Sequence, residues 1–275
     1  MGYRYPKLLV MQYSIRIFLV LISLGLSSLT SAQVLEVGIG GGGAGYIGDL
    51  NQDNNFKISG VSAGAFLKAN LSPYWALGVH YNYGRIKADD LRSSNEQFRM
   101  RGLNFNSDLH ELSLQADFNF LEYFAGGGPK NFTPYVFTGL GLLFFSPKGV
   151  YTDQATGENE WYRLRFYTTE GRSNSYRNFA LAIPYGVGAK IRLKDNWGLF
   201  TQVGYRTAFT DYIDDVSGNY PTPEGNENAV KTMLSDPTGI GRPGTQRGDF
   251  RKRDTYMFVG VGISFTFVSQ KCYTF

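Results

Sequence analysis

The chain has few of the residues on which catalysis, metal binding and internal crosslinking usually depend. Among its 275 residues there is one cysteine, Cys272, and there are two histidines, His80 and His110. A structural zinc site needs more cysteine or histidine than this, and no disulfide can form within the chain. Cys272 is therefore expected either to be an inert thiol or to form a link to another chain.

The chain also lacks an excess of charge once its first residues are set aside. An uncharged apolar run from Ile17 to Leu29 follows three basic residues, Arg4, Lys7 and Arg16. Small residues follow the run up to Ala32. This pattern predicts a secretory signal peptide over residues 1–32, and the run is shorter than the ~20 residues of a membrane helix. Removing these three basic residues from the 27 in the chain leaves 24 against 23 acidic residues, so we expect no nucleic-acid partner.

What the remaining chain has is alternation of apolar and polar residues. In the stretch Asp254–Phe267, Val259, Val261, Ile263 and Phe265 fall on one face of a strand, and glycine, serine and threonine fall on the other. A face this long suits a tilted strand that crosses a bilayer. We predict eight such strands: Val34–Gly42, Ile58–Leu71, Trp75–Arg85, Glu111–Leu121, Pro134–Phe145, Phe179–Leu193, Trp197–Phe209 and Asp254–Phe267.

The connections between the predicted strands alternate in length. Those after the second, fourth and sixth strands are short, and those after the first, third, fifth and seventh are long and polar. This alternation predicts an all-β fold, an eight-stranded antiparallel transmembrane β-barrel in the bacterial outer membrane, with periplasmic termini and four long extracellular loops. The barrel would take residues 33–268 and a periplasmic tail residues 269–275. Side chains fill a barrel of this size, so no diffusive pore is expected.

The polar faces of these strands would point into the barrel, where charged groups can neutralise one another. The predicted lumen network is Glu36, Lys68, His80, Glu111, Asp117, Lys190, Arg192 and Arg206. We interpret it as a structural plug. A barrel enzyme acting on lipids or peptides would need a histidine beside an acid at the outer rim, and neither histidine has that placement. We therefore predict a non-enzymatic protein without a cofactor.

Three acidic residues follow the seventh predicted strand: Asp211, Asp214 and Asp215. Their carboxylates could coordinate Ca²⁺. Alternatively, Asp211 and Asp214 cap a tight turn by accepting backbone hydrogen bonds. The sequence leaves both interpretations open.

The segment Trp197–Tyr220, with the glycine-rich opening strand through Leu50 and the stretches Thr133–Gly141 and Ala182–Gly188, resembles the PorG-like barrels of the Bacteroidetes type IX secretion system. The Thr168–Arg172 region matches that family less well. The resemblance implies an outer-membrane barrel of the secretion machinery, which is also linked to gliding motility. It further implies contact with a periplasmic ring made of a PorK-type lipoprotein and its PorN-type partner.

Contact with such a ring needs a periplasmic surface. The glycine-rich turn and the tail are the expected contact regions, through Glu122, Gly126, Gly127, Gly128, Lys130, Lys271 and Cys272, the last of which could form an intermolecular disulfide. The other partner is outer-membrane lipid. The alternatives are a lipid- or peptide-modifying enzyme that uses His80, and a small surface adhesin or channel.

Overall fold

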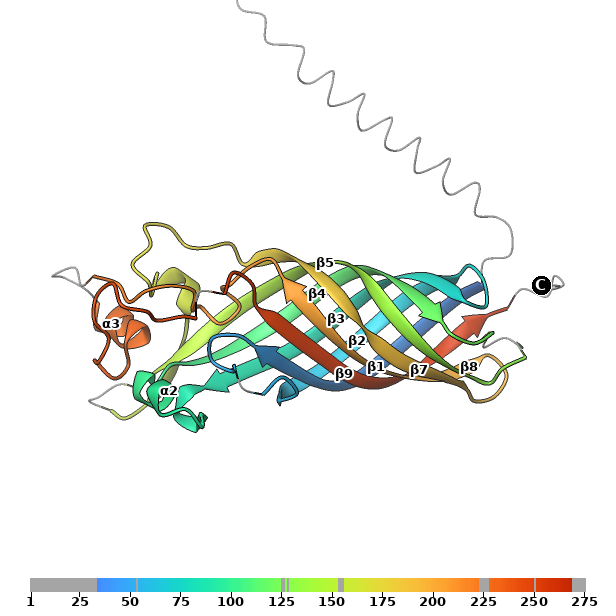
Figure 1. The fold of residues 1–275 in the computed structure, drawn as a ribbon, viewed down its shortest axis with the longest axis horizontal. Helices are drawn as coiled ribbons and strands as arrows, with labels where there is room; N and C mark the ends of the chain where they lie inside the picture. Colours follow the sequence, from blue (N-terminus) through green and yellow to red (C-terminus); the bar gives the residue numbers. More distant parts are fainter. Residues whose placement is uncertain are drawn as a thin grey trace, which may run out of the picture.

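A computed structural model describes residues 34–52, 54–124, 127, 129–152, 156–222, 228–249 and 251–268 (Figure 1). Its strands are β1 (Val34–Ile47), β2 (Ile58–Asn70), β3 (Trp75–Asp89), β4 (Asn104–Asn119), β5 (Phe132–Thr152), β6 (Asn159–Arg163), β7 (Phe179–Arg192), β8 (Trp197–Ala208) and β9 (Thr255–Phe267). Its short helices are η1 (Asp90–Arg92), α2 (Glu96–Arg101), η2 (Leu164–Phe166) and α3 (Ala229–Ser235). Within the described residues no helix is both long enough and apolar enough to cross a membrane.

Eight of these strands form a closed ring. Their order is β4-β3-β2-β1-β9-β8-β7-β5, and pairing of β5 with β4 closes the ring. Every neighbouring pair is antiparallel, and β6 is a short hairpin partner of β5 outside the ring. The predicted eight-stranded antiparallel barrel is confirmed.

The first and last strands lie side by side, with Leu35 opposite Phe267 and Ile47 opposite Thr255. Residues 34 and 267 are therefore at the same end of the barrel, which we call the terminal end. The helices α2 and α3 lie at the opposite end, which we call the loop end (Figure 1).

The alternation along the strands places apolar groups outside and polar groups inside over most of the barrel. On β4, Leu112 and Leu114 are about half exposed, whereas Glu111, Ser113 and Asp117 are buried. Other outward residues around the barrel are equally apolar, including Leu140 on β5, Leu181 on β7 and Val261 on β9. An outer surface of this kind is stable in lipid and costly in water, as in transmembrane β-barrels.

Several strands are longer at the loop end than predicted. β3 ends at Asp89 instead of Arg85, β4 begins at Asn104 instead of Glu111, and β5 ends at Thr152 instead of Phe145. The reason is that the pattern inverts there: Ile86, Phe105 and Leu109 point inward and are fully buried, while the outward positions become polar. These buried residues belong to an apolar core at the loop end, so this part of the barrel is built as a water-soluble barrel is.

Glycine lets the strands β1 and β9 pair closely. Gly42 lies opposite Gly260, and a Cβ added to Gly42 would stand 1.9 Å from the carbonyl oxygen of Val259. A Cβ on the adjacent Gly41 would meet its nearest neighbour at an ordinary 3.5 Å. Position 42 therefore excludes any side chain, whereas position 41 does not.

Candidate functional site

The lumen is crossed by an ion-pair cluster centred on Asp117. The Nζ atoms of Lys68 and Lys190 lie 2.7 and 2.9 Å from the same oxygen, Oδ2, of Asp117. Lys68 comes from β2 and Lys190 from β7, which are on opposite sides of the eight-stranded ring. All three side chains are buried, so the cluster joins opposite walls of the barrel.

A second cluster is centred on Glu111, closer to the loop end. Its Oε2 accepts a hydrogen bond of 2.7 Å from the Tyr256 hydroxyl and lies 3.3 Å from Nε of Arg206. Its Oε1 accepts hydrogen bonds from Asn82 and Ser113. Tyr256 comes from β9, opposite β4 in the ring, so this cluster also spans the lumen. The Arg206 guanidinium lies 4.6 Å from the centre of the Phe258 ring, which holds the charge by a cation–π contact.

The other predicted lumen residues divide into two groups. Glu36 is buried and accepts a hydrogen bond of 3.2 Å from Asn70, and His80 is buried and stacks on Phe66 with 5.2 Å between ring centres. Arg192 lies on the same face of β7 as the buried Lys190, but at the terminal rim, where it is half-buried. There its guanidinium donates to the carbonyl of Phe124 at 3.5 Å and to the Asn131 side chain. β7 ends at Arg192, so its side chain contacts the adjacent turn and not the two central ion-pair clusters.

The predicted contact residues of the glycine-rich turn lie at the terminal rim as far as the structure describes them. Glu122 is exposed and accepts a hydrogen bond of 2.8 Å from the Tyr74 hydroxyl, which ties two terminal-end turns together. Lys130 is exposed and its backbone bridges to Tyr123. Gly127 has a φ of 133°, a conformation that residues with a side chain rarely adopt. Gly126, Gly128, Lys271 and Cys272 lie outside the described residues.

The three aspartates predicted after the seventh strand do not share one site. Asp214 accepts from the Tyr46 hydroxyl and from the backbone N–H of Val216, which is the turn-capping role. Asp215 accepts from the hydroxyls of Thr169 and Tyr176. The interpretation of Asp211, Asp214 and Asp215 as one Ca²⁺ site is therefore wrong, because two of the three carboxylates are bound to other parts of the loop end.

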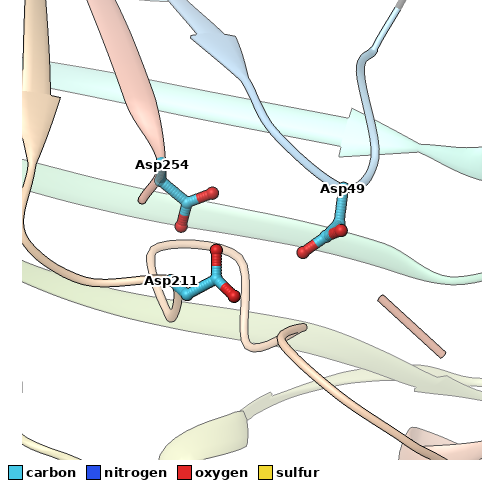
Figure 2. A group of neighbouring side chains, drawn as sticks. All are labelled: Asp49, Asp211 and Asp254. Carbon is cyan, nitrogen blue, oxygen red and sulfur yellow. The ribbon is translucent and has the colours of Figure 1, made fainter. Parts of the chain in front are cut away.

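Asp211 instead meets Asp49 and Asp254. Figure 2 shows these three carboxylates pointing toward one another, from the segments that follow β1, follow β8 and precede β9. One oxygen from each lies within 4.8 Å of the others, and all three residues are buried. Burial, together with the neighbouring carboxylate of Asp249, raises the pKa of Asp49 to about 8, and burial raises the pKa of Asp211 to about 6. Burial and the charges of Asp211 and Asp49 raise the pKa of Asp254 well above its ordinary value.

The sequence contained a signal for this second group of aspartates. A barrel closes only when its first and last strands pair, so residues just beyond the end of β1 and just before β9 must be neighbours. Asp49 and Asp254 hold those positions, and β8, which Asp211 follows, pairs with β9 on its other side. Clusters of residues that are close along the chain do not reveal this closure, which is why Asp49 and Asp254 were missed.

The chain is similar to solved structures of outer-membrane proteins, but its sequence identity with them is low. The major outer membrane protein of Thermus thermophilus is 16% identical, with a TM-score of 0.42 over 86% of this chain and 100% of that one. Ail, the attachment invasion locus protein of Yersinia pestis, solved with the heparin analogue sucrose octasulfate, is 10% identical, with a TM-score of 0.39 over 86% and 99%. Neisserial surface protein A is 11% identical, with a TM-score of 0.38 over 86% and 97%. The fold assignment rests on the strand pairing above, because scores this low do not decide it.

No curated protein sequence matches the chain significantly. A family profile does match, over residues 15–275, which is nearly the whole sequence. The chain therefore belongs to the family described as domain of unknown function DUF6089.

Proposed function

We propose that this protein is a non-enzymatic outer-membrane barrel of a type IX secretion machinery, where it anchors the periplasmic ring formed by a PorK-type lipoprotein and its PorN-type partner. The main support for the proposal is that ion pairs and hydrogen bonds cross the lumen between opposite strands. Clusters around Asp117 and Glu111 join opposite walls, so the interior serves stability and the surfaces at the two ends are left for partners.

The outer surface supports a location in the outer membrane. Half-exposed leucine and valine side chains surround the barrel, on strands that include β3, β4, β5 and β7. A closed barrel is one of the two structures that satisfy every backbone hydrogen bond in lipid. A signal peptide over residues 1–32 would supply export to that membrane.

The terminal rim supports the docking role. It is the end at which periplasmic turns are expected in outer-membrane barrels. The exposed Glu122 and Lys130 carry opposite charges on one turn, which suits orientation of a charged partner. The partners are suggested by the resemblance of segments such as Trp197–Tyr220 and Thr133–Gly141 to PorG-like barrels. That resemblance implies a ring of PorK-type and PorN-type proteins.

The histidines favour this role over catalysis. His80 is 4% exposed and packs against Phe66, and no carboxylate accepts from its ring among the hydrogen bonds of the described residues. His110 is on the outer surface, where Nδ1 lies 2.8 Å from the Tyr81 hydroxyl. Neither position combines an acid, a histidine and access for a substrate.

Site-specific photocrosslinking in the native host tests the docking role. A photoreactive amino acid at Glu122 or Lys130 is expected to crosslink to the ring lipoprotein after membrane solubilisation. The same residue at Trp161, which is 55% exposed on β6 at the loop end, provides the matched control and is expected to give no such product. Equal crosslinking from both ends, or none from the terminal rim, would count against the proposal. If Cys272→Ser leaves the complex with the ring lipoprotein unchanged, an intermolecular disulfide through Cys272 is ruled out, but the docking role is not.

A further inference from the structure

We infer that Asp49, Asp211 and Asp254 form a Ca²⁺-binding site that fastens the ends of β1, β8 and β9 at the loop end of the barrel. The site would hold the segment that follows β1 against the segments that follow β8 and precede β9. It does not depend on the secretion role, because it follows from the loop end alone.

The spacing of the carboxylates fits this ion. Ca²⁺ binds oxygen at about 2.3–2.6 Å, so two ligands on opposite sides of one ion are about 4.6–5.2 Å apart. One oxygen from each aspartate lies within 4.8 Å of the other two. A single Ca²⁺ can therefore contact all three carboxylates with little movement of the chain. Water and further oxygens of these carboxylates would complete the six to eight ligands that Ca²⁺ usually has.

Two of the carboxylates have an oxygen without a partner. Oδ2 of Asp49 and Oδ1 of Asp211 are buried and accept no hydrogen bond in the described part of the chain. Asp49 is 1% exposed and Asp211 is 8% exposed, and both carboxylates are directed into the cluster (Figure 2). Buried oxygens without partners are costly, so orphaned acceptors that converge on one point indicate a missing cation.

The remaining oxygens are held in place. The backbone N–H of Asp249 donates to Oδ1 of Asp49, and the backbone N–H of Ile213 donates to Oδ2 of Asp254 at 3.0 Å. These bonds fix the two carboxylates, and at Asp49 the other oxygen is left without a partner. Such backbone bonds are the kind of outer-shell contact that orients metal ligands.

No protein cation neutralises the cluster within the described residues. Arg101 contacts Asp49, but its Nε lies 2.6 Å from Asp90 and its Nη2 donates to the Asp49 carbonyl, not to the carboxylate. Arg247 is also engaged, with Glu170 at 3.3 Å and with Asp215 at 4.0 Å. Within the described residues the three buried carboxylates thus have no ion-pair partner in contact, and a divalent cation would supply one.

Protonation of the aspartates is the competing explanation, and calcium binding by the purified, refolded full chain separates the two. Titration of the wild-type protein with CaCl₂ at pH 7.5 is expected to show one site with a dissociation constant of about 0.1–1 mM, the range of extracellular calcium modules. At 10 mM CaCl₂ the thermal midpoint should rise by roughly 3–10 °C relative to EGTA.

Variants assign the binding to these residues. Asp49→Asn and Asp254→Asn should each weaken Ca²⁺ binding at least tenfold. Asp215→Asn is the matched control, because Asp215 is equally buried in the same loop but its carboxylate accepts from Thr169 and Tyr176, and the Ca²⁺ affinity of this variant should stay within twofold of wild type. Failure of the wild type to bind Ca²⁺ up to 10 mM would overturn the inference, even if a variant fails to fold. So would a preference for Mg²⁺, or wild-type affinity in the Asp49→Asn/Asp254→Asn double variant.

Discussion

Asp117→Asn should destabilise the barrel far more than an ordinary polar substitution. The change is nearly isosteric, but it removes the one carboxylate that lies within 3 Å of both Lys68 and Lys190. All three side chains are at most 4% exposed in their ion pairs, so water cannot replace the lost charge without entering the lumen.

The expected magnitude follows from this burial. Breaking a buried ion pair by removing one partner costs about 3–5 kcal/mol, because it leaves a charge uncompensated. Here one substitution leaves two ammonium groups together, so we expect a loss at the upper end of that range, about 4–5 kcal/mol. Contacts of Lys68 with the Phe66 ring at 4.1 Å and of Lys190 with the Tyr135 ring at 4.4 Å would recover part of it.

Urea unfolding of the protein in phospholipid vesicles, followed by tryptophan fluorescence and by the gel shift of the folded barrel, measures the loss. Asp108→Asn is the control: Asp108 also contacts two cations, Arg85 at 2.8 Å and Lys148 at 3.7 Å, but its side chain is 25% exposed. Exposed pairs contribute about 0–1 kcal/mol, so this variant should unfold almost as the wild type does.

A triple variant tests whether the unpaired charges cause the loss of stability. Replacing all three charged groups, in Asp117→Asn/Lys68→Met/Lys190→Met, should restore most of the stability, because no unpaired charge remains. The reasoning is refuted if Asp117→Asn unfolds at the same urea concentration as Asp108→Asn, or if the triple variant is less stable than Asp117→Asn. Either result would mean that water in the lumen already screens these charges.

Three further predictions test other parts of the structure. Gly42→Ala should cost about 1–3 kcal/mol or prevent folding, because its Cβ would overlap the Val259 carbonyl, whereas Gly41→Ala should stay within about 0.5 kcal/mol in the same urea assay. In EGTA the thermal midpoint should fall as pH rises from 5 to 8: the raised pKa of Asp49, about 8, means that the folded state binds more protons than the unfolded state, and Asp49→Asn should flatten this slope. The groups around Asp49 are Asp211, Asp214, Asp249, Asp254, Tyr46 and Arg101. The protein should give no steady conductance in planar bilayers, and single-channel steps would contradict a braced lumen.

Period-two alternation predicts the eight barrel strands over their lipid-facing lengths and most of the inward residues, but not β6. Glu111 and Asp117 on β4 point inward because they occupy alternate positions to Leu112 and Leu114, which face outward, and that relation is local in sequence. The pairing of Asp117 with Lys68 and Lys190 could not be predicted in the same way. It depends on the stagger between strands around the ring, which the spacing of residues along one strand does not encode.

The loop end was harder to predict for a different reason. Beyond the lipid-facing region the apolar residues change from the outward to the inward face of the strands. The outward apolar pattern therefore places Ile86 and Phe105 in a loop, although they continue β3 and β4. The inward apolar pattern of a soluble barrel predicts both extensions.

The positions of the ion-pair clusters around Asp117 and Glu111 limit what the interior of the barrel can do. Asp117 and Glu111 lie six residues apart on β4, which corresponds to about 20 Å along the strand. Above Glu111 the lumen is occupied by Leu109, Phe105 and the rest of the apolar core. Ion pairs and apolar packing therefore block the interior at successive levels from one end to the other, and no polypeptide can pass through it. The role proposed above must consequently use the outside of this barrel, as an anchor for partners that form the passage elsewhere.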